Sequence, residues 1–228
     1  QQMSMNFILT GNPGTGKTSI ARKMGEVLQS MEILPTSRVI EASRATLVGK
    51  YMGETPKIVN NMCDKAMGGI LFIDEAYTLS SENDQYGKEA IDTLMKRMED
   101  DRGKFVVIAA GYQKEMEDFM NVNPGLASRF THKMHIEDYN EDELLAIYKK
   151  MAAKDNYTLS PAAEFKLMDL ICRKVVTKSD SFGNAREMRN MLDETIQQLS
   201  VRVSGMPQNE VTQETYQMIL PEDIKDEL

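Results

Sequence analysis

The chain has 228 residues and carries 27 Lys and Arg against 35 Asp and Glu, which gives a net charge of −8. This charge argues against a dedicated duplex-DNA-binding protein, because such proteins need clustered cations to displace phosphate counterions. No apolar run approaches the ~20 residues needed to cross a bilayer, and the two cysteines are too few for a disulfide framework. We therefore expect one large domain or two modest ones, without membrane contacts, in the reducing cytoplasm.

Short apolar runs alternate with helical patterns along the first part of the chain. The apolar runs predict strands at 5–10, 38–42, 69–74, 104–110 and 133–136. The helical patterns predict helices at about 17–29, 55–67 and 87–99. Strands that are largely apolar and separated by helices indicate a parallel sheet covered on both faces. In such α/β sheets, ligands bind at the carboxyl ends of the strands.

The pattern changes near residue 138, and from there we find no strong strand signal. Amphipathic helices are predicted at about 141–154, 160–176 and 184–204. Their candidate openings are Asn140 as an N-cap, Ser160 followed by Pro161, and the pair Gly183–Asn184. We therefore expect an α/β domain over 1–138, with its parallel sheet flanked by helices. A small all-α lid domain over 139–228 would follow, with a hinge near 137–140.

The run GNPGTGKT matches the phosphate-binding pattern G-x-x-x-x-G-K-[ST], between a predicted strand and a predicted helix. Glycines let backbone N–H groups converge on phosphates, and the helix N-terminus adds a favourable partial charge. Lys17 would reach the β- and γ-phosphates of ATP, and the Thr18 hydroxyl would ligate Mg²⁺. The alternative is an incidental glycine-rich turn. The candidate nucleotide-binding residues of this run are Gly11, Asn12, Pro13, Gly14, Thr15, Gly16, Lys17, Thr18 and Ser19.

Two acids, Asp74 and Glu75, close the third predicted strand. Asp74 would hold the metal, usually through water, as a Walker B acid. Glu75 is placed to orient or deprotonate the attacking water. Alone, such a pair would be read as solvated strand-end acids, but the phosphate-binding pattern upstream favours the functional interpretation.

Four segments together resemble the AAA+ ATPases, namely GNPGTGKT, GGILFIDEAY, NPGLASRF and FGNAREMRNML. More narrowly, they resemble the CbxX/CfqX (CbbX, SpoVK-like) branch, which includes the red-type Rubisco activases. The resemblance covers nearly the whole chain, with the motifs in the family's order. It implies an ATPase that uses ATP and Mg²⁺, assembles into a ring, a hexamer, and remodels or partly threads a protein substrate. It names no substrate, and it does not establish Rubisco as one.

The resemblance assigns roles to two arginines. Arg129 matches the arginine finger, which reaches the γ-phosphate bound to a neighbouring subunit; the alternative is a surface ion pair. Arg186 matches sensor 2, a lid residue that contacts the nucleotide of its own subunit; the alternative is a helix-surface arginine. One position departs from the family pattern, because Gly111 or Tyr112 stands where sensor 1 is usually Asn or Thr.

The segment VGKYMG resembles pore loop 1 of the family, in which Lys50, Tyr51 and Met52 would grip a threaded peptide. The alternative is an aromatic buried under the sheet. The polar segment 80–86 could be a second pore loop or a solvated turn.

Two other classes of function stay open. A nucleic-acid motor or clamp-loader-like ATPase shares the same core, but it should carry basic pore loops, and Lys50 is the only cation at 48–53. A nucleotide-gated scaffold with weak turnover would explain the unusual sensor 1 position. Because family members carry further residues before the first strand, we also expect this sequence to be part of a longer protein.

Overall fold

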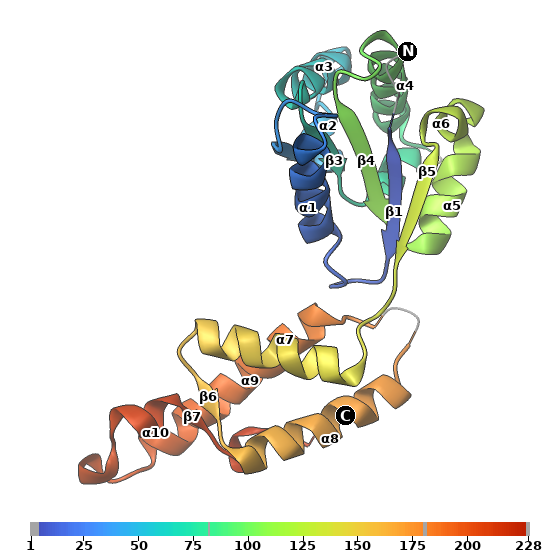
Figure 1. The fold of residues 1–228 in the computed structure, drawn as a ribbon. Coiled ribbons are helices and arrows are strands. Elements are labelled where there is room, and N and C mark those ends of the chain that lie inside the picture. Colours follow the sequence, from blue (N-terminus) through green and yellow to red (C-terminus); the bar gives the residue numbers. More distant parts are fainter. Residues whose placement is uncertain (1–4, 82, 180–181, 227–228) are drawn as a thin grey trace. The chain divides into compact units, whose positions relative to one another are not determined.

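The computed structural model describes residues 5–81, 83–179 and 182–226 (Figure 1). The chain divides into two compact units, and the division does not follow the sequence in one step. The first unit holds Gly16–Ile136 together with the chain up to Gly11. The second holds the chain from Glu137 onward together with the short stretch Asn12–Thr15. Within the described ranges, no helix is both long and apolar enough to span a bilayer.

A parallel sheet forms the centre of the first unit, as predicted. Its strands, in the spatial order β2-β3-β4-β1-β5, are β2 (Val39–Ala42), β3 (Ile70–Ile73), β4 (Val106–Gly111), β1 (Phe7–Gly11) and β5 (His132–Ile136). Thr10 pairs with Gly111, and Ile73 pairs with Ala109. The residues that follow β1, β3 and β4 therefore come out at one edge of the sheet, where α/β proteins bind ligands.

Helices pack on both faces of the sheet, and successive residues of each strand point to opposite faces. The helical elements of this unit are α1 (Lys17–Ser30), α2 (Arg44–Leu47), α3 (Glu54–Ala66), η1 (Ala76–Ser80), α4 (Gln85–Asp100), α5 (Gln113–Val122) and α6 (Pro124–Arg129). Leu71 and Val107 pack into a core with side chains of α3, α4 and α5. Phe72 and Ile108 pack on the other face, against α1.

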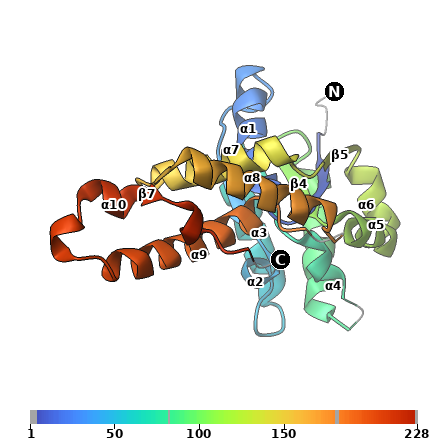
Figure 2. The same cartoon turned by 90° about the horizontal axis from the view of Figure 1, so that it is seen from below.

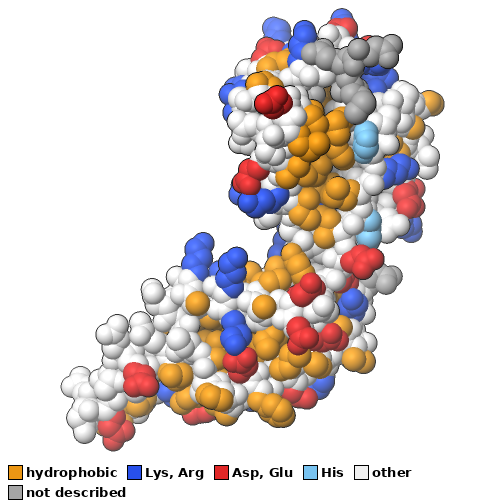
Figure 3. All heavy atoms as spheres, viewed as in Figure 1, with side chains coloured by type: hydrophobic (Ala, Val, Ile, Leu, Met, Phe, Trp, Pro, Cys, Tyr) orange, Lys and Arg blue, Asp and Glu red, His pale blue; other side chains and the backbone are white. Residues whose placement is uncertain are grey.

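The edge strand β5 is the most exposed strand of the sheet. Its residues His132–His135 are exposed, and Met134 has 40% of its surface accessible. Figure 3 shows hydrophobic side chains gathered over β1 and β4, between α1 and the two histidines of β5. Since α1 is the helix that packs on this face among the described elements, the part of the face nearest β5 is left open.

The second unit consists mainly of helices, with its chain turning back through α10 at the end of α9 (Figure 2). Its elements are α7 (Glu141–Lys154), β6 (Thr158–Leu159), α8 (Pro161–Val176), α9 (Ala185–Ser204), η2 (Gln208–Glu210), α10 (Gln213–Gln217), β7 (Met218–Ile219) and η3 (Pro221–Asp223). The three long helices match the predicted ones, and Leu144, Leu167 and Leu192 form their buried centre. The lid is helical as predicted, and it also contains two strands of two residues each, β6 and β7, which pair in parallel and gave no signal in the sequence.

Two of the three predicted helix openings are confirmed. Asn140 caps α7 in a reciprocal arrangement with Glu143, whose backbone N–H it accepts at 2.9 Å. Ser160 accepts the N–H of Ala163 at 3.2 Å, with Pro161 in the first turn of α8. Asn184 stands before α9 as predicted, but its side chain does not cap that helix.

The end of the described chain is tied to α9 by a buried ion pair. Arg202 donates to both carboxylate oxygens of Asp223, at 2.8 and 2.9 Å, and to the carbonyl of Met218 at 2.9 Å. Asp223 is 1% exposed and also accepts the N–H of Leu220. The pair thus joins η3 and β7 to the last turns of α9.

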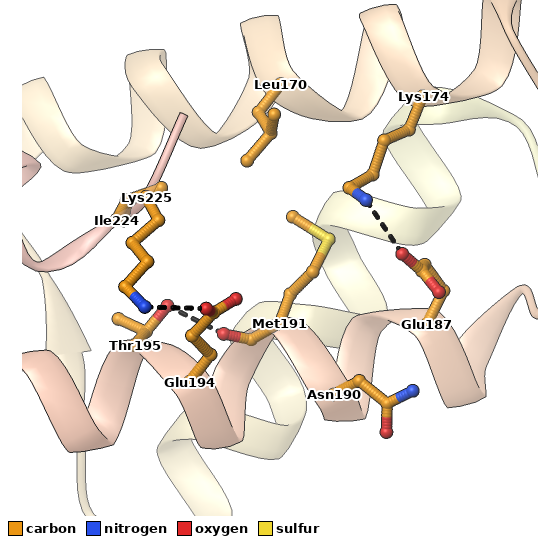
Figure 4. A pocket seen from close by; sticks show the side chains of 9 residues that line it. All are labelled: Leu170, Lys174, Glu187, Asn190, Met191, Glu194, Thr195, Ile224 and Lys225. Carbon is orange, nitrogen blue, oxygen red and sulfur yellow. Dashed lines mark hydrogen bonds and ion pairs between the residues drawn. The ribbon is translucent and has the colours of Figure 1, made fainter. Parts of the chain in front are cut away.

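A cavity of about 100 Å³ lies between α8, α9 and the segment after η3 (Figure 4). Its apolar lining includes Leu170 and Met191. Both lysines that line it are already paired, Lys174 with Glu187 at 2.9 Å and Lys225 with Glu194 at 3.0 Å. These ion pairs hold the first half of α9 against its neighbours.

Candidate nucleotide-binding site

The predicted phosphate-binding loop follows β1 and leads into α1. Gly14 and Gly16 have φ values of 69° and 91°, the left-handed region that glycine adopts without steric cost. The first turn of α1 contains no acidic residue, so the positive end of its helix dipole is not offset there. Glycines in this conformation before a helix N-terminus are typical of a cradle for phosphate groups. The residues present therefore fit the nucleotide that the sequence predicts.

Lys17 lies at the same edge of the sheet. Its ammonium group donates to the carbonyl of Gly11 at 2.8 Å and lies 5.4 Å from the centre of the Tyr112 ring. Thr18, the predicted Mg²⁺ ligand, is the next residue of α1 and is half-buried, whereas Ser19 is exposed. The lysine and the hydroxyl predicted to serve the phosphates thus both start from the first turn of α1.

Asp74 and Glu75 follow β3 at this edge. Asp74 is half-buried, and its carboxylate accepts the N–H of Glu75 at 3.1 Å. Glu75 is exposed and has a φ of 50°, which costs a residue with a side chain about 1–2 kcal/mol. Thr78 holds this turn by donating its hydroxyl and its N–H to the carbonyl of Glu75, at 2.7 and 2.9 Å. Such strain is typical of functional sites.

Two tyrosines stand beside these acids. The rings of Tyr77 and Tyr112 lie 5.8 Å apart, and burial together with the charge of Glu75 raises the pKa of Tyr77 to about 12. A side chain at Gly111 would come within 2.7 Å of the Tyr77 ring. Tyr77 was not predicted as a site residue, although it follows directly after the acidic pair and Ala76. Tyr112, at the unusual sensor 1 position, shares its surroundings with Lys17 and Tyr77.

The side chain of Arg129 is engaged within its own unit. Its guanidinium donates to the carbonyls of Met95 and Gly125, both at 3.1 Å, and lies 3.6 Å from Glu99. The side chain is 26% exposed. This arrangement matches the alternative interpretation as an ion-paired arginine, and the role of an arginine finger stays a prediction.

In the second unit, the stretch Asn12–Thr15 lies against the start of α9. The N–H of Ala185 donates to the carbonyl of Gly14 at 3.1 Å. The backbone N of Arg186 lies 2.7 Å from the point where a Cβ on Gly14 would stand. The Arg186 side chain is exposed, and among the described residues it has no hydrogen bond or ion pair. The predicted sensor 2 residue is therefore close to the loop backbone, and its charge is not neutralised there.

The predicted pore loop lies between α2 and α3. Tyr51 and Met52 are 71% and 88% exposed, so the alternative of an aromatic buried under the sheet is wrong. The carboxylate of Glu54 accepts the N–H groups of Lys50 and Tyr51, at 3.0 and 3.1 Å. The base of the loop is thus fixed while its side chains face solvent. The candidate second loop at 80–86 includes Glu82, which lies outside the described residues.

Comparisons with known proteins identify the class. Residues 7–138 match the model of the ATPase family associated with various cellular activities (AAA), and residues 140–228 match the AAA lid domain. The chain belongs to the AAA family of ATPases, and this membership implies nucleotide binding.

Individual proteins of similar sequence and structure place the chain more narrowly within this family. The chain is 43% identical to stage V sporulation protein K of Bacillus subtilis over 89% of its length. It is 38% identical to the chloroplastic ribulose bisphosphate carboxylase/oxygenase activase of Cyanidioschyzon merolae over 96% of its length. It spans 63% of the first relative and 75% of the second. In structure, it matches the AAA domain of FIGL-1 in complex with ADP, with a TM-score of 0.64, 17% identity, and 96% and 69% of the two chains covered.

Proposed function

We propose that this chain is the motor module of an ATP-hydrolysing ring protein that remodels or partly threads a protein substrate.

 The observation that carries the proposal is the set of groups at one edge of the sheet, namely Lys17 at the start of α1 and the acidic pair after β3. The glycine-rich loop leads directly into α1 in the chain. The family and its relatives support the same activity.

Each residue of this set has a role in the proposed reaction. The loop amides and Lys17 would bind the phosphates, and Thr18 and Asp74 would hold Mg²⁺. The metal, when bound, supplies charge stabilisation at the phosphoryl oxygens. Glu75 would orient the attacking water and take its proton, because it is exposed at the strand end beside Asp74. The strained backbone of Glu75 supports this role.

Hydrolysis would be completed between copies of the chain. Arg129 would act on the nucleotide of a neighbouring copy, and it must first leave the carbonyls of Met95 and Gly125. Arg186 would sense the nucleotide of its own copy from the start of α9. We therefore expect a ring, a hexamer, whose ATPase rate per chain rises with protein concentration.

A protein is the substrate class that the pore loop favours. Tyr51 and Met52 offer apolar contact that tolerates many sequences. Lys50 is the single cation at 48–53, whereas a loop that tracks nucleic acid needs several. The relative whose name specifies an activase supports the same class of substrate.

The test is Glu75→Gln, which keeps the size of the side chain and removes its basicity. We expect it to bind ATP as the wild type does and to lose turnover by about 100-fold or more, the usual contribution of a general base. Glu214→Gln, an exposed lid residue, is the matched control and should keep full activity. Near-normal hydrolysis by Glu75→Gln would refute the mechanism. Binding with no turnover in the wild type at any protein concentration would favour a nucleotide-gated scaffold.

The substrate itself can be sought with the same variant. ATP-loaded Glu75→Gln should retain its protein partner, which can then be captured from a lysate and identified. Stimulation of the wild-type ATPase by DNA and not by the captured protein would favour the nucleic-acid motor.

A further inference from the structure

All four carbonyl groups of the stretch Asn12–Thr15 accept a hydrogen bond. One donor belongs to the stretch itself, and three come from the lid residues that share its unit. The pairs are Thr15 Oγ1 to the Asn12 carbonyl at 2.8 Å, Asn184 Nδ2 to the Pro13 carbonyl at 3.4 Å, the Ala185 N–H to the Gly14 carbonyl at 3.1 Å, and the Tyr139 hydroxyl to the Thr15 carbonyl at 3.0 Å.

These bonds also fix where the N–H groups of the loop point. In a trans peptide, the carbonyl of one residue and the N–H of the next point in opposite directions, and the described residues contain no cis peptide. Holding the carbonyls of Pro13, Gly14 and Thr15 toward the lid therefore turns the N–H groups of Gly14, Thr15 and Gly16 away from it. Converging N–H groups are what a loop needs to bind phosphate.

Asn184 is the centre of this arrangement. It is fully buried and has a φ of 49°. Its side-chain amide lies between the loop and the segment at 138–139. Its amide nitrogen also donates to Asp138 at 2.8 Å, and its amide oxygen accepts the N–H of Tyr139 at 2.9 Å. Both ends of this side chain are therefore used to hold the loop and the first lid residues together.

Asp138 supplies the charge of the arrangement. The same carboxylate oxygen that accepts from Asn184 accepts the side-chain amide of Asn12 at 2.9 Å, and the other oxygen accepts Lys178 at 2.8 Å. Partial burial alone would raise the pKa of Asp138, but the hydrogen bonds from Lys178, Asn184 and Asn12 hold that pKa below its usual value. The carboxylate is therefore ionised at neutral pH and anchors the first residue of the stretch.

We propose that Asp138, Tyr139 and Asn184 are positioning residues that hold the phosphate loop with its N–H groups turned toward the nucleotide phosphates. This inference rests on the proposed nucleotide binding. It assigns the lid a task in the empty protein, in addition to any contact that Arg186 makes with a bound nucleotide.

The test compares two hydroxyl deletions in the same unit. Tyr139→Phe removes the bond to the Thr15 carbonyl, whereas Tyr148→Phe removes a buried bond to Thr195 inside the lid core. We expect Tyr139→Phe to raise the Kd for ATP by about 3–10-fold, as for the loss of one neutral hydrogen bond. Tyr148→Phe should lower lid stability and leave the Kd unchanged.

A second readout uses the protein without nucleotide. Amide hydrogen exchange at Gly14–Gly16 should be faster in Tyr139→Phe than in the wild type, and faster still in Asn184→Gly. Glycine adopts the positive φ of residue 184 without strain, so this variant loses only the side-chain hydrogen bonds. Tyr148→Phe should leave exchange at these amides unchanged. Unaltered exchange and an unaltered Kd in Tyr139→Phe and Asn184→Gly would overturn the inference. If the wild type binds no ATP, the proposed function fails, while the exchange measurement still decides this inference.

Discussion

Gly14 offers the sharpest test of how the loop is held, through the substitution Gly14→Ala. The residue has a φ of 69°, and an added Cβ would stand 2.1 Å from the carbonyl oxygen of Gly183 and 2.7 Å from the backbone N of Arg186. Both neighbours are backbone atoms, so neither can rotate away. The loop or the start of α9 must move, and the bond from Ala185 to the Gly14 carbonyl is lost with that movement.

The expected magnitude follows from two costs. An alanine in the left-handed region costs about 1–2 kcal/mol. The lost hydrogen bond adds about 0.5–1.5 kcal/mol. If nucleotide binds only to the loop conformation seen in the structure, both costs reduce the free energy of nucleotide binding by Gly14→Ala. The total of about 1.5–3.5 kcal/mol corresponds to a Kd for ATP raised by about 10–400-fold.

Isothermal titration with ATP and ADP measures this effect, and Gly53→Ala is the matched control. Gly53 has a φ of 78°, but nothing lies within 4 Å of its Cβ position. Gly53→Ala should therefore show the backbone strain alone, as a loss of stability without a change in nucleotide affinity. A Kd for Gly14→Ala within 2-fold of the wild type would refute the reasoning, because the close approach of Gly183 would then place no constraint on the loop.

Two further predictions concern buried groups. Asp223→Asn leaves Arg202 without its charged partner and should lower the free energy of unfolding by about 3–5 kcal/mol in urea. The double change Arg202→Met with Asp223→Leu should cost clearly less, and an equal cost would contradict this account of the pair. Burial raises the pKa of Cys63 to about 11, so at pH 8 its thiol should react with a disulfide reagent only after unfolding, whereas the half-buried Cys172 reacts in the native protein. Rapid labelling of Cys63 in the native protein would contradict this. Because burial raises the folded pKa above the ordinary value of 9.0, the Cys63 thiol leaves the free energy of unfolding unaffected below about pH 9 and lowers it as the pH rises toward 11.

The sheet and the long helices could be predicted because their signals are local. β3 is a continuous apolar run that ends in an acid, and α7 spans the predicted 141–154 because its cap and its apolar spacing lie within the helix. The helix α5 was missed although Met116, Phe119 and Met120 have helical spacing, so a readable signal was present. The strands β6 and β7 have two residues each, too few to carry a period, and their pairing depends on residues about 60 positions apart.

The site was predictable only where a motif carries it. The glycines, Lys17 and the pair after β3 lie where the pattern indicates. The three lid donors to the loop could not be read from the sequence, since Tyr139 reaches a carbonyl 124 positions away. Asn184 was interpreted as a helix opening, which accounts for its position but not for the use of its side chain. The engagement of Arg129 with α4 likewise depends on tertiary packing that no local pattern specifies.

The grouping of Asn12–Thr15 with the lid means that the polypeptide crosses between the two units three times, after Gly11, after Thr15 and after Ile136. In a chimera that joins this α/β domain to the lid of a relative at residue 138, Asn12–Thr15 would face lid residues of the other protein. Successful chimeras should therefore transfer the loop and the lid together. For the same reason, we expect substitutions in the loop, at 138–139 and at 184–185 to covary among relatives. The residues that evolve together would then come from separate parts of the gene.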